Sequence, residues 1–323
     1  MAGAGNARRT AVTLRRTKVA VIGLGQWGRN HARIYAGLPD VELAAVVDVN
    51  NADLRGFAHR YKAEAFTDYR KVLGRVEAVS VVVPTNLHFE VAKAFLEADA
   101  HVLVEKPMTA TTAEAAGLVE LARRKNKMLL VGHIERFKPA VRRLVELARK
   151  PMFIQARRVR PYDGARTMDV GVVMDLMIHD IDVVLSLVRG GRIVELGGIA
   201  VRVHNSQEDL AVAHLTLSTG CVAWLLASRV SADKAAEIEV TTPDRVIRLD
   251  YLKQRLAIHP FHGEVEDMAI HGDEPLRAEL RHFINCVNGE EQPLVSGEDG
   301  LQALEVAHRL LQQMSTVAPP VKV

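Results

Sequence analysis

The stretch KVAVIGLGQWG (residues 18–28) decides the fold. Its first half is a short apolar run that predicts a strand, and its glycines form the pattern GxGxxG at Gly23, Gly25 and Gly28. In a dinucleotide site Gly23 makes the tight turn, Gly25 lets the backbone approach the pyrophosphate, and Gly28 lets the next helix pack closely on the strand. The N-terminus of that helix offers free N–H groups and a partial positive charge to the phosphates.

The residue that supports this interpretation is Asp48, which ends the next apolar run, VELAAVVD (41–48), twenty residues after Gly28. Its carboxylate is suited to accept hydrogen bonds from the ribose hydroxyls and would repel a 2′-phosphate, so NAD is expected rather than NADP. The alternative is that Asp48 caps a helix beginning near Asn51. The predicted cofactor loop consists of Gly23, Gly25, Gln26, Trp27 and Gly28.

Strand and helix patterns alternate through the first half of the chain. Apolar runs that predict strands lie at 18–23, 41–48, 76–84, 100–105 and 128–135, and helical patterns lie at 26–38, 51–62, 87–98 and 111–125. Short connections between such elements predict a parallel sheet covered on both faces, the doubly wound Rossmann fold. We place this domain at residues 18–135.

The second half, residues 136–323, has a different pattern. Strands are predicted at 152–163, 193–203, 210–218, 220–230, 236–242 and 245–251, with two closing helices that start near Pro275 and Ser296. Tight turns between the strands and a helix-rich remainder predict an open-faced, mostly antiparallel sheet with helices on one face.

Composition excludes several classes of function. The 323 residues hold 42 Lys and Arg against 39 Asp and Glu. Residues 1–17 contain four arginines and no acid, which predicts a disordered basic tail, and the rest has 38 basic against 39 acidic residues. That balance argues against a nucleic-acid surface, and no run approaches the ~18 apolar residues of a membrane helix. The two cysteines have no CxxC spacing, which indicates a reducing, cytoplasmic compartment.

Two motifs follow the central strands of the predicted parallel sheet. VEKPM places Glu105 and Lys106 at the end of one strand, where ligands of open α/β sheets bind. Lys106 is therefore a candidate proton acceptor or donor, and the alternative is an ordinary loop lysine. In PTNLHFE (84–90), Pro84 and Thr85 are expected under the nicotinamide.

Two further residues of PTNLHFE open a helix. Asn86 is a candidate cap for it. His88 faces either the cleft, as part of the cofactor site, or the surface.

A polar stripe runs through the apolar stretch DVGVVMDLMIHDIDVVLSLV (169–188). Asp175, His179, Asp182 and Ser186 have the spacing of one helix face, although the helix is otherwise buried. An Asp one turn from a His fits a base and the group that orients it. The alternatives are an internal Asp–His network or a metal site, and we expect no metal because no further ligands cluster.

GHIERFKPAV (132–141) lies where the two domains join. His133, Glu135 and Arg136 would leave the last parallel strand at the level of the cleft and contact substrate, with Pro139 opening the next helix. The alternative for Arg136 is a salt bridge with Glu135 or Glu105.

Four arginines add positive charge near the first strand of the second domain: Arg157, Arg158, Arg160 and Arg166. Alternate residues of a strand face opposite ways, so only some of them can reach one ligand. Arg160 and Arg166 are the candidates for a substrate diphosphate, and a solvated face is the alternative.

GLGQWG, VEKPM and DLMIHDID, in this order, resemble the Gfo/Idh/MocA oxidoreductases over about residues 18–313. The resemblance implies that Lys106 and His179 flank the reacting carbon, that Asp175 assists, and that the second-domain sheet packs into dimers or tetramers.

GHIERFKPAV and the DxxxH helix are most similar to one branch of that family, the UDP-N-acetylglucosamine 3-dehydrogenases. This similarity implies NAD-dependent oxidation of the C3 hydroxyl of UDP-N-acetylglucosamine to a 3-keto sugar. That product would feed an aminotransferase in the synthesis of diamino-sugar lipid A or related glycans. The alternatives are a dehydrogenase of another sugar, an inositol or a UDP-uronic acid, and a non-catalytic dinucleotide-binding regulator.

Overall fold

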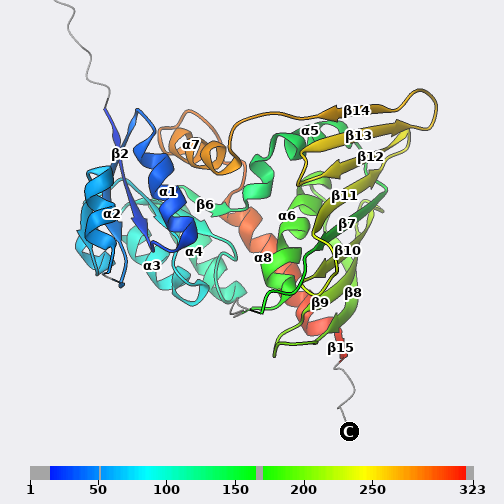
Figure 1. Cartoon of the computed structure of the whole chain (residues 1–323), viewed down its shortest axis with the longest axis horizontal. Coiled ribbons are helices and arrows are strands. Elements are labelled where there is room, and N and C mark those ends of the chain that lie inside the picture. The colour runs from blue at the N-terminus through cyan, green and yellow to red at the C-terminus, as the bar shows by residue number, and fades with distance from the viewer. Residues whose placement is uncertain (1–14, 51, 165–169, 318–323) are drawn as a thin grey trace, which may run out of the picture.

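The computed structural model describes residues 15–50, 52–164 and 170–317, so most of the predicted basic tail lies outside the described residues. Two sheets stand at opposite ends of the molecule, with helices between them (Figure 1).

The first sheet has six parallel strands in the order β3-β2-β1-β4-β5-β6. The strands are β1 Thr17–Ile22, β2 Val41–Val47, β3 Glu64–Phe66, β4 Ala78–Val81, β5 His101–Glu105 and β6 Leu129–Gly132, and the helices between them are α1 Gln26–Ala36, α2 Leu54–Tyr61, α3 Thr85–Glu97 and α4 Thr112–Lys125. The doubly wound Rossmann prediction is confirmed. Strand β3 was not predicted, because its three residues, one exposed and two half-buried, form no apolar run.

The second sheet has nine strands in the order β14-β13-β12-β11-β7-β10-β9-β8-β15. The strands are β7 Phe153–Val159, β8 Ile193–Val201, β9 Leu210–Leu217, β10 Val222–Ser228, β11 Ala235–Thr241, β12 Arg245–Asp250, β13 Arg255–Pro260, β14 Glu266–Ala269 and β15 Ser315–Val317. All neighbours are antiparallel except the pairs β7–β10 and β8–β15. The mostly antiparallel prediction is confirmed.

One face of this large sheet is covered by helices and the other is open. Figure 1 shows the helices on the side that looks toward the first sheet: α5 Pro139–Leu147, α6 Ile178–Leu187 and α8 Gly297–Gln313. The polar stretch around Asp175 enters α6 through a π-helical turn, Val173–Met177. Pro139 opens α5 as predicted.

Helix α7 (Pro275–Val287) returns from the second half of the chain to the first sheet. Its buried residues, among them Leu280 and Phe283, join the hydrophobic core formed by β1, β2, α1 and α2. Helices α3 and α4 pack in the other core, on the opposite face of the sheet. The Rossmann half is thus completed by a segment that lies about 140 residues further along the chain than its last strand.

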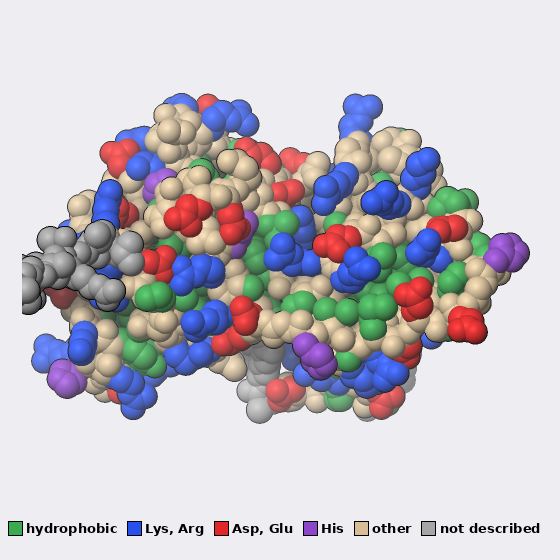
Figure 2. All heavy atoms as spheres, turned by 90° about the horizontal axis from the view of Figure 1, so that it is seen from above, with side chains coloured by type: hydrophobic (Ala, Val, Ile, Leu, Met, Phe, Trp, Pro, Cys, Tyr) green, Lys and Arg blue, Asp and Glu red, His purple; other side chains and the backbone are tan. Residues whose placement is uncertain are grey.

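The surface in Figure 2 carries Lys and Arg side chains interspersed with Asp and Glu. Among the described residues, no helix combines the length and the apolar character that crossing a bilayer requires.

Candidate functional site

The three glycines of the predicted cofactor loop each meet a different requirement. Gly23 has φ +94°, and a Cβ there would lie 2.4 Å from the carbonyl oxygen of Val82. A Cβ on Gly28 would lie 1.8 Å from the carbonyl oxygen of Gly23, so a side chain would push α1 off the loop. A Cβ on Gly25 meets nothing within 4 Å. Gly25 therefore leaves an open backbone surface at the start of α1, as a bound pyrophosphate requires.

Asp48 ties the end of β2 to this loop. Its carboxylate accepts the backbone N–H of Leu24 at 2.6 Å and that of Asn50 at 2.8 Å. Helix α2 begins at Leu54 with Asp53 as its N-cap, so Asp48 does not cap it. The loop, the free start of α1 and a carboxylate at the end of β2 together fit a dinucleotide. Gln26 and Trp27 form the first turn of α1, and Trp27 is exposed.

His88 is a buried residue of helix α3, and this helix does not begin where the sequence predicted. Helix α3 begins at Thr85 with Pro84 before it, so Asn86 is not the cap. His88 is only 1% exposed, and its Nδ1 and Nε2 lie 2.9 and 2.8 Å from the carbonyl oxygens of Pro107 and Val83. Burial shows that the surface alternative for His88 is wrong, and its place in the cofactor site stays a prediction.

Lys106 connects the first sheet with the second half of the molecule. It follows β5, and the peptide bond to Pro107 is cis. Its Nζ donates to the carbonyl oxygen of Asp175 at 2.9 Å and to the Asp175 carboxylate at 3.4 Å. The other carboxylate oxygen accepts from Arg160 at 3.1 Å. Both cations neutralise Asp175, and Lys106 is held as a donor close to the DxxxH segment.

His179 lies next to this pair without being held by it. Its Nδ1 is buried and has no hydrogen-bond partner among the described residues. Burial, and next the charge of Lys106, lower the pKa of His179 well below its ordinary value. The prediction that Asp175 orients His179 is wrong. The π-helical turn at Val173–Met177 breaks the four-residue repeat, and Asp175 binds Lys106 and Arg160 instead.

His133 faces His179 from the end of β6. The two ring centroids lie 6.4 Å apart with the planes nearly perpendicular. His133 is 1% exposed, and burial lowers its pKa. We call Lys106, His133, Arg160, Asp175 and His179 the Lys106 cluster.

The rest of the polar stripe is structural. Asp182 is buried and accepts from Arg136 at 3.2 Å, while Ser186 donates to the carbonyl oxygen of Val183. Arg136 also donates to the carbonyl oxygen of Leu294. Neither predicted partner of Arg136, Glu135 or Glu105, is the observed one. Arg136 joins the two halves of the molecule through Asp182, which occupies the guanidinium that was expected to bind substrate anions.

Glu135 is also engaged by charged groups of the protein itself. It is buried and paired with Lys138 and Arg158, and Arg158 in turn pairs with Asp180 at 2.8 Å. The positive charges of Arg158 and Lys138 outweigh burial and lower the pKa of Glu135. The oxygens of Glu135 are thus engaged in an internal ion network, and its substrate role stays a prediction.

Glu105 is engaged by groups of the first half of the chain. It accepts from His31 at 3.1 Å and from the backbone N–H of Lys106 at 3.2 Å. His31 was not among the predicted site residues, because its partner lies 74 residues away in sequence and no local spacing reveals such a pair. Arg166, the other candidate for a diphosphate, lies outside the described residues.

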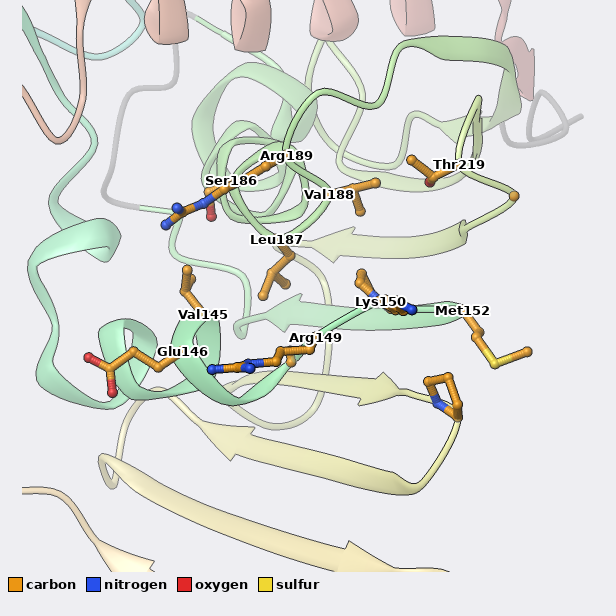
Figure 3. A pocket seen from close by; sticks show the side chains of 14 residues that line it. Val145, Glu146, Arg149, Lys150, Met152, Ser186, Leu187, Val188, Arg189 and Thr219 are labelled. Atoms are coloured by element: carbon orange, nitrogen blue, oxygen red, sulfur yellow. The ribbon is translucent and has the colours of Figure 1, made fainter.

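The groove shown in Figure 3 has a volume of about 990 Å³ and lies at the C-terminal ends of α5 and α6. Arg149 and Arg189 follow these helix ends, where cations interact favourably with the helix dipole. None of its lining residues belongs to the Lys106 cluster or to the glycine loop. It is therefore a different feature from the site that the motifs predict. Within the described ranges, no group of three or more His, Cys, Asp or Glu could hold a metal ion.

Comparison with known proteins gives matches over nearly the whole chain. The family model for the Gfo/Idh/MocA oxidoreductase NAD-binding Rossmann fold matches residues 17–133, and the model for the family's C-terminal alpha/beta domain matches residues 153–323. UDP-N-acetylglucosamine 3-dehydrogenase of Acidithiobacillus ferrooxidans is 34% identical over 90% of this chain and 95% of its own length.

Two further matches agree with this result. A solved structure of the Acidithiobacillus ferrooxidans enzyme superposes with a TM-score of 0.88 at 33% identity, covering 93% of this chain and 98% of that one. Myo-inositol 2-dehydrogenase of Thermotoga maritima is 26% identical over 89% of this chain and 93% of its own. With its open glycine loop and its Lys106 cluster, the chain belongs to the NAD-dependent Gfo/Idh/MocA oxidoreductase family.

Proposed function

We propose that this protein oxidises the C3 hydroxyl of UDP-N-acetylglucosamine to the 3-keto derivative. The observation that carries the proposal is the contact of Lys106 with Asp175, which brings an ammonium group of the first sheet beside the DxxxH segment of the second half. The substrate rests on the 34% identical relative, whose name states this activity.

The residues divide the proton chemistry between them. When bound, NAD supplies the acceptor for the hydride that leaves C3. The lowered pKa of His179 keeps its ring neutral at pH 7, so it is suited to take the hydroxyl proton. The hydrogen bond to Asp175 holds the Lys106 ammonium beside the DxxxH segment. This position supports a role of the ammonium in stabilising the negative charge that develops on the sugar oxygen. Asp175 thus acts on Lys106 rather than on His179.

The cofactor and the sugar are expected to contact neighbouring groups. Gly25, Gln26 and the start of α1 are proposed to receive the pyrophosphate, Asp48 the ribose, and Pro84 and Thr85 the nicotinamide end. Arg160 and His133 remain candidates for contacts with the sugar nucleotide, because both lie in the Lys106 cluster.

Exposed apolar residues on the open face of the large sheet support self-association of the protein. Trp224 on β10 is 53% exposed and Ile199 on β8 is 52% exposed, and Val212, on the strand between them, lies with them in a mainly apolar hollow. We propose that the protein forms homodimers or homotetramers through this sheet. The two cysteines are free and buried, which supports a cytoplasmic setting.

The test is incubation with NAD and UDP-N-acetylglucosamine, with a carbonyl trap or a downstream aminotransferase to draw off the product. Mass spectrometry should show the sugar nucleotide losing two hydrogens, and the Lys106→Met variant should show no loss. UDP-glucuronate, glucose and myo-inositol serve as competing substrates. Faster oxidation of one of them would replace the proposed sugar. NAD binding without oxidation of any of them would indicate a dinucleotide-binding regulator.

A further inference from the structure

Two buried histidines that the proposed proton transfer does not use hold the segment Glu105–Pro107 from opposite sides. His31 comes from α1, the helix that follows the glycine loop, and His88 comes from α3, the helix that follows Pro84. Lys106 lies between the two residues that they contact. Both histidines are almost completely buried, at 0% and 1% exposed.

His31 acts on Lys106 through Glu105. A carboxylate only accepts, so the Nε2–H of His31 donates to Glu105 Oε1 at 3.1 Å, while Glu105 Oε2 accepts the backbone N–H of Lys106 at 3.2 Å. Gly132 leaves room for this arrangement, because a Cβ there would lie only 3.0 Å from the Glu105 carboxyl group. Burial opposes ionisation of Glu105, but the hydrogen bond from His31 and the charges around it outweigh burial and lower its pKa.

His88 fixes the other side of Lys106. Its Nδ1 lies 2.9 Å from the carbonyl oxygen of Pro107, and its Nε2 lies 2.8 Å from that of Val83. Burial lowers the pKa of His88, and a neutral ring has one N–H, so the ring donates to one of these carbonyl oxygens and packs against the other. In either tautomer the ring lies between the chain just beyond β4 and the residue that follows Lys106. The segment that carries Lys106 is thus tied to two helices, and each of these helices begins at a loop that is expected to contact the cofactor.

We propose that His31 and His88 are positioning residues that set where the Lys106 ammonium stands relative to Asp175 and the reacting hydroxyl. This inference rests on the proposed role of Lys106 in proton chemistry. Geometry matters at this scale, because a misplacement of about 1 Å can cost roughly 100-fold in rate. His31 and His88 therefore join the cofactor loops and the lysine into one rigid unit.

The test compares variants that remove the ring's hydrogen bonds with variants that keep a donor: His31→Leu against His31→Gln, and His88→Leu against His88→Gln. Each is labelled with an amine-reactive reagent at a series of pH values, without NAD or sugar, and mass spectrometry follows the rate at Lys106. Glu105, His133, Asp175 and His179, whose charges act near Lys106, are kept in every variant. The Leu variants should shift the pH profile of Lys106 labelling, and the Gln variants should restore most of it.

The same variants are then assayed with NAD and the sugar nucleotide. We expect kcat to fall about tenfold or more in the Leu variants, with KM for the sugar little changed and partial rescue by Gln. The matched control is His101→Leu. His101 lies at the opposite end of the same strand and accepts the backbone N–H of Met128 at 3.0 Å. This control should lose thermal stability without moving the labelling profile.

The outcomes separate the two proposals. The positioning role would be overturned if the Leu variants lost stability as His101→Leu does, while Lys106 labelling and the ratio of kcat to KM stayed unchanged. A shifted labelling profile in a protein that oxidises no sugar would uphold the positioning role and overturn the proposed activity.

Discussion

Lys106 donates to both the backbone carbonyl and the carboxylate of Asp175, at 2.9 and 3.4 Å, and so joins the parallel sheet to the second half of the molecule. Of the two bonds, the one to the carbonyl does not depend on the Asp175 side chain. The position of Lys106 is therefore set by backbone on both sides, by its own cis-proline segment and by the turn that carries Asp175.

Removing the ammonium should abolish most of the oxidation. Lys106→Met should lower kcat about 10³-fold, the upper end of the range for losing a group that stabilises developing negative charge. Asp175→Asn keeps the carbonyl acceptor and should cost less, about tenfold. Rates of NADH formation measure both effects, and calorimetric titration with NAD is the control, which should show unchanged binding. Lys106→Met enzyme with most of its turnover would contradict the assignment.

The acid side of the pH–rate profile should report His179. Burial and the charge of Lys106 lower its pKa well below the ordinary value, so the ring stays neutral as the pH falls through about 6.5 and gains a proton only below that. We therefore expect kcat/KM to hold its value through about pH 6.5 and to decline at more acid pH. A half-maximal point above pH 6.5 would contradict a neutral, buried base. In the Lys106→Met variant the charge that lowers the pKa of His179 is lost, so the acid limb of the remaining activity should lie at higher pH.

The glycine loop and the strand-ending motifs could be predicted because they act locally. Gly23 is required by its positive φ in the turn and Gly28 by its contact with Gly23, both within one β-turn-α unit, and Lys106 follows its strand directly. Periodicity likewise indicated the parallel sheet, whose strands are buried on both faces.

The partners of the polar stripe could not be predicted in the same way. Helical spacing assumed 3.6 residues per turn through Asp175 and His179, whereas Asp175 lies in the π-helical turn and His179 lies in the α-helix that follows it. Asp182 pairs with Arg136, 46 residues away in sequence, and Glu105 pairs with His31, 74 residues away in sequence. Such pairings depend on tertiary packing, which a single sequence does not encode in its spacing.

Asp48 should control the choice between the two nicotinamide cofactors. Asp48→Ser removes the charge that would repel a 2′-phosphate and weakens the bonds to the Leu24 and Asn50 amides. We expect KM for NAD to rise about tenfold and the ratio of kcat/KM for NAD to that for NADP to fall. Glu42→Ser, on the same strand, is the control and should leave that ratio unchanged. An unaltered ratio in Asp48→Ser would exclude Asp48 from cofactor selection.

Glu279 on α7 should make the fold less stable at alkaline pH. Both carboxyl oxygens are buried without a hydrogen-bond partner among the described residues. Burial, and next the charge of Glu105, raise its pKa well above the ordinary value. From about pH 4.3 up to that raised pKa, the folded state keeps a proton that the unfolded chain releases, so stability falls as pH rises through this window.

The neutral variant Glu279→Gln removes this dependence. It should raise the free energy of unfolding at about pH 8 by roughly 1–3 kcal/mol relative to the parent, with a smaller gain at about pH 5. Urea denaturation at both pH values measures it. Glu274→Gln, at the N-cap of the same helix, is the control, because Glu274 is exposed and paired with Arg33. Equal gains at the two pH values would show that Glu279 is ionised in the fold.

The return of α7 to the first sheet has a consequence for protein engineering. Leu280 and Phe283 pack in the core beside α1. A chain cut after residue 135 would therefore expose the apolar surface of the Rossmann half that α7 covers, and would be prone to self-association. Chimaeras that graft the sugar-recognising half of one relative onto another should therefore exchange residues 136–274 and retain 275–287 with their original host.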